Sequence, residues 1–429
     1  MRTMQSAVKL RGWVQAVVAV ALVSVIAACG GGGGGDSSSS GNNSSTTLNG
    51  GSLPASPTQQ PIAATAANTV AITVGRGVNG VINIPTVSVT VCAPGSTTNC
   101  QKIDNIQVDT GSFGLRLVSS VLNSSLLNGG LPISTLSGAQ LAECATFADG
   151  FTWGTVRTAT IQIGGETTAS PIPIQIIGDS AAGAAPSGCG SGSAENTATD
   201  LGANGILGIG TAPTDCGATC STPSTATNYS NYFTCGTSCA RATVPLSQQV
   251  ANPVANFTAD NNGVIVQMPP VSNTGAASAT GTLVFGIGTQ SNNALAATQT
   301  FTTDTFGNMN NSVFNGTTVQ AFFDSGSNAY FFADSSLAQC GSNFAGFYCP
   351  SSAQTRSITL GGLSSTRASA SIGILSASTL FSNTSNYAFN DLAGQIGGNS
   401  SFDLGLPFFY GRYMYYGFAT STQAPYVGF

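Results

Sequence analysis

The sequence predicts an all-β protein built from two related lobes. Its 429 residues include 54 glycines, and only 6% of the residues are charged. Such a composition favours short strands joined by turns over a helical fold. The second observation is a repeat, in which an apolar strand runs into Asp-Thr-Gly-Ser at 109–112 and into Asp-Ser-Gly-Ser at 324–327. A duplicated half-domain of this kind would bring two carboxylates together.

Each repeat carries its own hydrogen-bond donors for the aspartate. A carboxylate that directly follows a buried strand is costly unless its oxygens are hydrogen-bonded. The tight turns at Gly111 and Gly326 present backbone N–H groups, and Ser112 and Ser327 add hydroxyls. The sequence therefore predicts two carboxylates in matched, donor-lined turns.

The composition also excludes several classes of function. The chain has no histidine, which excludes Ser-His and Cys-His catalysis and histidine-ligated metal, and leaves carboxylates as the expected acid–base groups. Its net charge is −5 with eleven lysines and arginines, so it has no basic footprint for nucleic acid. We expect no cofactor, no bound metal and a monomer.

The first residues predict a targeting segment. Basic residues precede an apolar run from Val14 to Ala28, which is too short for a lasting membrane span. The run ends in Ile-Ala-Ala-Cys29, which resembles the bacterial lipoprotein box, whose cysteine is lipidated. Gly30 follows rather than Asp, which implies the outer membrane. Residues 1–28 are then a signal peptide and the protein is a cell-envelope lipoprotein; an ordinary signal peptide with an incidental cysteine is the alternative.

The next segment predicts a flexible tether. Residues 29–68 are rich in Gly, Ser, Asn, Thr and Pro and cannot bury a core. As a disordered coil, such a segment spans about 35 Å. The folded part is expected to begin at Thr69.

Ten cysteines remain when the one in the lipoprotein box is set aside. An even number in an exported chain predicts five disulfides. Cys92–Cys100 and Cys340–Cys349 are expected to be local bridges. The close pairs Cys216/Cys220 and Cys235/Cys239 leave open a four-thiolate zinc site.

The repeats and the order of the motifs around them resemble the pepsin-like aspartic proteases. The motifs, in the family's order, are the loop at 109–112, a flap-type turn at 147–150, Gly-Ile-Leu-Gly-Ile-Gly at 205–210, Gly-Thr-Leu-Val-Phe-Gly at 281–286, the loop at 324–327, Asp-Leu-Gly-Leu-Pro-Phe-Phe-Tyr-Gly-Arg-Tyr at 403–413 and Tyr-Val-Gly-Phe at 426–429. The resemblance covers about residues 70–429. It implies two six-stranded-type β lobes, at 69–268 and 269–429, with the active-site cleft between them.

The resemblance also assigns roles to residues. It implies that Asp109 and Asp324 are a catalytic dyad that shares one proton and activates a water. The other implied positions are the loop-supporting residues Thr110, Gly111, Ser112, Ser325, Gly326 and Ser327, and the flap residues Phe147, Asp149 and Gly150. The function implied is a membrane-anchored aspartic endopeptidase for peptide or protein substrates, with apolar side chains preferred beside the scissile bond.

Two positions depart from the family. The flap tyrosine is replaced by Phe147, and the tryptophan after the first loop by Arg116. In pepsins those two side chains hydrogen-bond each other. Trp153 is a candidate to fill part of the space. The alternative function is therefore a binding module of the same fold, with a weak or silent dyad, that holds peptide, glycan or an envelope partner.

Overall fold

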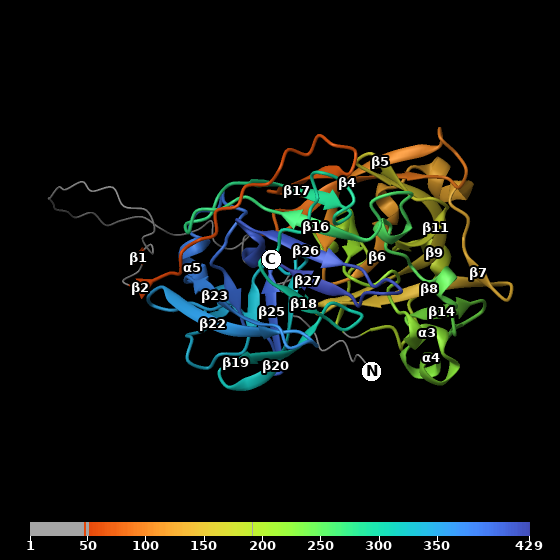
Figure 1. The fold of residues 1–429 in the computed structure, drawn as a ribbon. Coiled ribbons are helices and arrows are strands. Elements are labelled where there is room, and N and C mark those ends of the chain that lie inside the picture. Colours follow the sequence, from red (N-terminus) through yellow and green to blue (C-terminus); the bar gives the residue numbers. More distant parts are fainter. Residues whose placement is uncertain (1–46, 49–50, 191) are drawn as a thin grey trace, which may run out of the picture.

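The computed structural model describes residues 47–48, 51–190 and 192–429, and strands dominate it (Figure 1). The predicted signal peptide, the lipidation site at Cys29 and the first part of the tether lie outside these residues. Within the described part, no helix is long and apolar enough to cross a membrane. The all-β prediction is confirmed.

Two sets of hydrogen-bonded strands form the body of the molecule. The larger set comprises β3 (Thr69–Val74), β4 (Pro85–Cys92), β5 (Cys100–Asp109), β6 (Phe113–Val118), β7 (Thr135–Leu136), β8 (Ala139–Thr146), β9 (Gly150–Ile163), β10 (Glu166–Thr167), β11 (Ile172–Ile177), β12 (Ser193–Ala194), β13 (Gly205–Ile209), β14 (Tyr232–Cys235), β15 (Cys239–Arg241), β16 (Gly263–Gln267), β17 (Ala279–Phe285), β18 (Thr300–Thr302), β26 (Tyr413–Gly417) and β27 (Tyr426–Gly428). The smaller set is a seven-stranded sheet of β19 (Met309–Phe314), β20 (Thr317–Asp324), β21 (Tyr330–Phe332), β22 (Gln354–Gly361), β23 (Arg367–Ile374), β24 (Ala393–Gly394) and β25 (Ser401–Gly405).

The remaining elements are short. They are the strand pair β1 (Thr47–Leu48) and β2 (Gly51–Ser52), the helices α2 (Ala198–Leu201), α3 (Ala218–Ser221), α4 (Pro223–Tyr229) and α5 (Ala377–Leu380), and the single turns η1 (Ser119–Val121), η2 (Leu126–Gly130), η3 (Ser180–Ala182), η4 (Leu246–Gln248), η5 (Val254–Asn256), η6 (Ser342–Phe344) and η7 (Leu406–Phe409).

The two halves share one local topology around their aspartates. In the first half, β13 runs parallel to β5 and antiparallel to β6, so it fills the space between the strands on either side of the first loop. In the second half, β25 runs parallel to β20 and antiparallel to β21. Glycine makes this close approach possible: a Cβ on Gly208 would lie 2.6 Å from the backbone N of Phe113, and one on Gly405 only 2.1 Å from the carbonyl oxygen of Ala329. The duplication read from the sequence is therefore present in the strand order.

The strand count and the lobe boundary differ from the six-stranded expectation. The second-half sheet has seven strands. β17 lies beyond residue 268 yet pairs with both β3 and β16, and β26 pairs with β16. Strands from both ends of the chain thus meet in the middle of the molecule (Figure 1). The strand pairing therefore does not separate two lobes at residues 268/269, because β17 and β26, which follow this position, pair with strands that precede it.

The last part of the predicted tether is ordered, so its boundary at 68 is wrong. Leu53 is buried in a hydrophobic cluster of the second half. Further along, Gln59 bonds through its backbone N–H to the carbonyl of Gly411, at 3.0 Å, and Ile62 donates its N–H to the side chain of Gln267, at 2.9 Å. A segment of turn-like composition can order when the body supplies hydrogen-bond partners. We call residues 53–61 the N-terminal strap.

All ten cysteines pair, as predicted. The bridges are Cys92–Cys100, Cys144–Cys189, Cys216–Cys220, Cys235–Cys239 and Cys340–Cys349. Both C-x3-C pairs are disulfides, so their sulfurs are not available as thiolates and the zinc alternative is wrong. The described residues contain no group of three or more metal-ligating side chains.

Candidate active site

The first aspartate ends a strand and is held by the turn that follows it. Asp109 is the last residue of β5 and is fully buried. Its Oδ1 accepts a hydrogen bond from the N–H of Gly111 at 2.9 Å, and its Oδ2 accepts one from the hydroxyl of Ser112 at 2.7 Å. Donors two and three residues along the chain therefore satisfy the buried carboxylate, as the sequence predicts.

The second aspartate has the same environment. Asp324 is the last residue of β20 and is 3% exposed. Its Oδ1 accepts from the N–H of Gly326 at 2.7 Å, and its Oδ2 from the hydroxyl of Ser327 at 3.0 Å. The two loops thus repeat each other atom for atom.

Reciprocal hydrogen bonds join the two loops. The Ser325 hydroxyl accepts from the N–H of Thr110 at 3.1 Å and donates to the carbonyl of Val108 at 2.7 Å. The Thr110 hydroxyl accepts from the N–H of Ser325 at 2.9 Å and donates to the carbonyl of Phe323 at 3.3 Å. All four bonds are buried, where a satisfied polar network fixes a single geometry. The loops are therefore locked against each other.

Gly111 lies between the two carboxylates. Its N–H binds Asp109, and a Cβ added to it would lie 2.5 Å from the Cγ of Asp324. No side chain fits at this position without displacing the second carboxylate. The glycine of the first loop is thus required for the approach of the two aspartates as well as for its own turn.

Three buried polar residues beneath the loops were missed in the sequence. Gln107 donates to the carbonyl of Gly326 at 3.0 Å, and the Tyr416 hydroxyl donates to the carbonyl of Phe323 at 3.1 Å. Asp403, fully buried on β25, belongs to one of the family-like motifs but its side chain was given no role. Gln107 lies in the strand of the first aspartate but bonds to the second loop, and Tyr416 and Asp403 come from strands β26 and β25; these contacts across the chain arise only through tertiary pairing.

The pKa of the Tyr416 phenol reflects this position. Burial raises it well above the ordinary value, a hydrogen bond with Thr110 opposes the shift, and the carboxyl groups of Asp324, Asp403 and Asp109 add to it. The phenol therefore stays protonated and keeps its donor.

A pocket opens in front of the loops and is lined from both halves of the chain. Its lining includes five phenylalanines, Phe113, Phe147, Phe306, Phe322 and Phe323. The polar lining residues are Thr110, Ser112, Arg116, Thr146, Asp215, Asn231, Asn308, Gln320, Asp324 and Tyr416. Asp324 therefore lies beside a largely aromatic surface.

The predicted flap is the hairpin between β8 and β9. At its turn the N–H of Phe147 donates to the carbonyl of Gly150 at 2.8 Å, and Phe147 lines the pocket. Asp149 belongs to the same turn. The start of β9 pairs in parallel with β12, and the Cys144–Cys189 disulfide ties β8 to the loop between β11 and β12.

Trp153 does not fill the space beside Phe147, so that expectation is wrong. Its indole N–H donates to the carbonyl of Gly183 at 3.0 Å, and its ring packs edge-on against Phe233 with centroids 5.6 Å apart. Instead, the guanidinium carbon of Arg116 lies 6.0 Å from the centroid of the Phe147 ring. The two departures from the family pattern therefore contact each other.

Comparison with known families places the chain. Residues 64–429 match a family described as "Protein of unknown function (DUF3443)". The chain belongs to the DUF3443 family. Comparison of this DUF3443 protein with curated proteins gives no match. Among solved structures it is similar to an aspartic proteinase from Irpex lacteus, with 16% sequence identity and a TM-score of 0.47 over 85% of this chain and 97% of that one.

Proposed function

We propose that this protein is an aspartic endopeptidase. The observation that carries the proposal is the reciprocal bonding of Thr110 and Ser325, which locks the two donor-lined carboxylate loops together. Asp324 lines the pocket, and the residues that follow Asp109 in the first loop line it as well. Gly111 binds Asp109 through its N–H, and a Cβ on it would meet the carboxyl of Asp324, so the two carboxylates are neighbours. Neighbouring carboxylates cannot both ionise cheaply, so they would share a proton and titrate as a pair.

The geometry supports hydrolysis of a peptide bond by an activated water. The ionised carboxylate takes a proton from the water, whose oxygen attacks the peptide carbonyl carbon, while the protonated carboxyl of the pair donates to the forming oxyanion. The carboxyl that took the water's proton then gives it to the peptide nitrogen, the other carboxylate takes back a proton from the diol, and the C–N bond breaks to release an amine and a carboxylic acid. The hydroxyls of Ser112 and Ser327 hold one oxygen of each carboxylate and so fix its orientation. The aromatic lining selects apolar side chains next to the scissile bond.

The test is a peptide-library digest with the soluble domain, residues 51–429, from about pH 3 to 7, the range in which carboxylates near their reference values titrate. Cleavage next to apolar residues is expected. A parent protein that is folded and silent throughout this range would overturn the endopeptidase proposal. If it still held peptides, the binding-module alternative would take its place.

The proposal includes an outer-membrane address, with lipid on Cys29 as the only membrane attachment and a peptide or protein as the substrate of a monomer. We predict that the full-length protein fractionates with membranes and that Cys29→Ser releases it, because one covalent lipid group is then lost. Fractionation of cells expressing either form measures this. A processed Cys29→Ser protein that stays with membranes would contradict the lipid anchor.

A further inference from the structure

A buried cluster of charges lies at the base of the flap. The guanidinium of Arg116 contacts Glu143 at 2.6 Å and Asp215 at 3.3 Å, and all three side chains are at most 5% exposed. We call these three residues the flap-base cluster. Arg116 comes from β6 directly after the first Asp loop, Glu143 from β8 just before the flap turn, and Asp215 from the segment after β13. One side chain thus connects three separate parts of the pocket wall.

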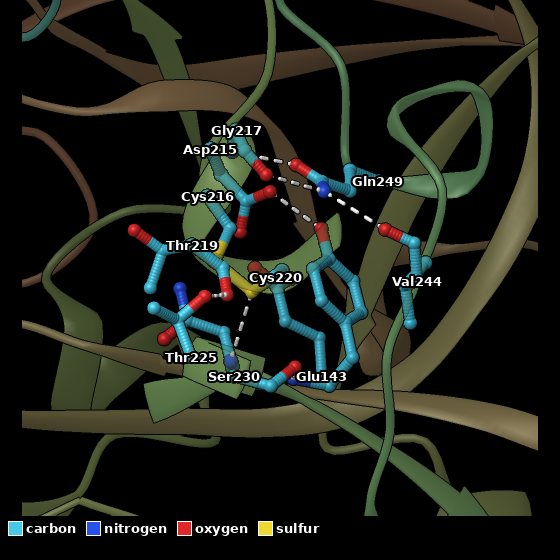
Figure 2. Close-up of a disulfide and its surroundings, with 12 residues drawn as sticks. Glu143, Asp215, Cys216, Gly217, Thr219, Cys220, Thr225, Ser230, Val244 and Gln249 are labelled. Carbon is cyan, nitrogen blue, oxygen red and sulfur yellow. Dashed lines mark hydrogen bonds between the residues drawn. A yellow bond between two sulfur atoms is a disulfide. The ribbon is translucent and has the colours of Figure 1, made fainter. Parts of the chain in front are cut away.

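Asp215 is held from behind. The hydroxyl of Tyr232 donates to Asp215 at 2.5 Å and accepts from the N–H of Val250 at 2.6 Å. The next residues form the Cys216–Cys220 disulfide, and the Gln249 side chain bonds to both the N–H and the carbonyl of Gly217 (Figure 2). The hydrogen bond from Tyr232 and the disulfide-closed segment that follows Asp215 therefore fix the position of the carboxylate that contacts Arg116.

The flap is connected to the same cluster through both of its strands. The carbonyl of Glu143, on β8, accepts from the Gln175 side chain at 2.8 Å, and Gln175 accepts from the Thr152 hydroxyl, on β9, at 2.8 Å. At the turn, the Phe147 ring faces the guanidinium carbon of Arg116. Arg116 also donates to the carbonyl of Phe113, in the strand that leaves the first Asp loop, at 2.8 Å. A continuous set of contacts therefore runs from that loop to the flap tip.

The charges favour an arginine at this position. Burial works against the charged guanidinium, but the carboxylates of Glu143 and Asp215 outweigh it and raise the pKa of Arg116. Burial raises the pKa of Glu143 well above its ordinary value, although Arg116 opposes the shift. Arginine can hold two carboxyl groups and a carbonyl at once and still present its face to a ring, which the single ammonium of lysine cannot.

We propose that Arg116 is the positioning residue of the flap, and that its contact with Phe147 sets the flap over the pocket. In the pepsin-like enzymes a hydrogen bond between tyrosine and tryptophan positions the flap, and here the contact between Arg116 and Phe147 takes that role. The inference rests on the proposed function for its effect on turnover, but the mechanical coupling between the cluster and the flap does not. Arg116 acts through Phe147 and Glu143 and takes no part in proton transfer.

The experiment compares Arg116→Lys, Phe147→Leu and the double variant with the parent. Phe147→Leu removes the ring while leaving the ion pairs intact, so it tests the contact even if Arg116→Lys fails to fold. Each single variant should lower kcat/KM about tenfold, because it removes the cation–π contact and lets the flap move away from its position over the pocket. The loss should come mainly as a higher KM, since a displaced flap weakens substrate binding. Because both changes break one contact, the double variant should be no worse than the poorer single one.

Hydrogen exchange provides a readout that needs no activity. Both single variants should speed exchange of the amides at 145–150. Arg157→Lys is the matched control: Arg157 is a buried arginine of the same half, paired with Asp179 at 2.7 Å, and it does not line the pocket. This control should lower thermal stability and leave flap exchange unchanged.

The outcomes separate the two proposals. Unchanged flap exchange in Phe147→Leu, or additive effects in the double variant, would overturn the positioning role. If the parent protein cleaves nothing, the proposed function fails, while faster flap exchange in the variants still supports the coupling. Loss of thermal stability alone in Arg116→Lys, without any change at the flap, would mean that Arg116 is only structural.

Discussion

Asp109→Asn and Asp324→Asn should each abolish peptide cleavage while the protein stays folded. Asparagine keeps the size of the side chain. Its carbonyl oxygen can still accept from the N–H of Gly111 or Gly326, and its NH2 group can donate to the hydroxyl of Ser112 or Ser327, which reverses that bond. It cannot take or give the shared proton, so either the base or the acid is lost. Positioned acid–base groups contribute about 10²–10⁴-fold to a rate, and a loss at least that large is expected in kcat.

The measurement is kcat for a peptide found in the library digest, with thermal unfolding as a check on the fold. Asp104→Asn serves as the control, since that carboxylate is 66% exposed and its partners, Lys102 and the hydroxyl of Ser88, lie at the surface. The control should cleave like the parent. Asn variants that retain parental kcat would contradict the dyad.

The second large effect concerns stability and pH. Asp391 is 5% exposed, and its Oδ2 has no hydrogen-bond partner among the described residues. Burial raises the pKa of this carboxyl from 3.8 to about 7. It lines a small pocket with Tyr330 and Arg412, which residues 54–57 of the N-terminal strap also line.

The sign of the effect follows from proton binding. Between about pH 4 and pH 7 the unfolded chain has lost the proton of Asp391 and the folded protein keeps it, so folding takes up a proton and stability falls as pH rises. A pKa difference of one unit corresponds to about 1.36 kcal/mol. The rise in the pKa of Asp391 from 3.8 to about 7 therefore lowers the free energy of unfolding by about 4 kcal/mol between pH 4 and pH 7. We therefore predict that the domain is more stable at pH 4 than at pH 7.

Asp391→Asn should remove most of this slope and stabilise the domain near neutral pH. Urea unfolding of the disulfide-intact protein from pH 4 to 8 measures it. Asp334→Asn is the matched control with the opposite sign: burial opposes ionisation there, but hydrogen bonds from Ser336 and Arg356 lower the pKa of Asp334. Asp334→Asn should cost stability above pH 4 and little below it. A parent that gains stability from pH 4 to 7, or an Asp391→Asn protein with the parental slope, would contradict the assignment.

The sequence alone could predict those parts of the site whose contacts are local. Asp109 and Asp324 find their donors two and three residues along the chain, so the residue types in each loop already specify the turn. The same holds for Cys92–Cys100 and Cys340–Cys349, whose partners are eight and nine residues apart. Repetition of one local pattern, in a chain without histidine, was enough to predict the duplicated fold and the paired carboxylates.

Only the tertiary structure decided the contacts between distant segments. Glu143 and Asp215 reach Arg116 from 27 and 99 residues away, so no spacing rule could have joined them. Asn83 is a second case: its amide bonds to the backbone of Asn328 and Phe389 and accepts from Tyr410, linking the start of the chain to the second Asp loop. Its φ of +50° is a conformation that asparagine tolerates better than most residues.

The strap and the flap show the same contrast between what the local sequence predicts and what tertiary contacts decide. The composition of residues 53–61 predicts disorder, because it contains too little apolar surface to fold by itself. The N–H of Gln59 donates to the carbonyl of Gly411, and just beyond the strap the N–H of Ile62 donates to the side chain of Gln267, so the body of the protein holds the segment in place. Likewise, Phe147 and Arg116 could each be recognised as a departure from the pepsin-like pattern, but their compensation for each other depends on where β6 and the flap meet. The sequence gives the type of each side chain, whereas the packing of strands that are far apart in the chain determines which side chain it contacts.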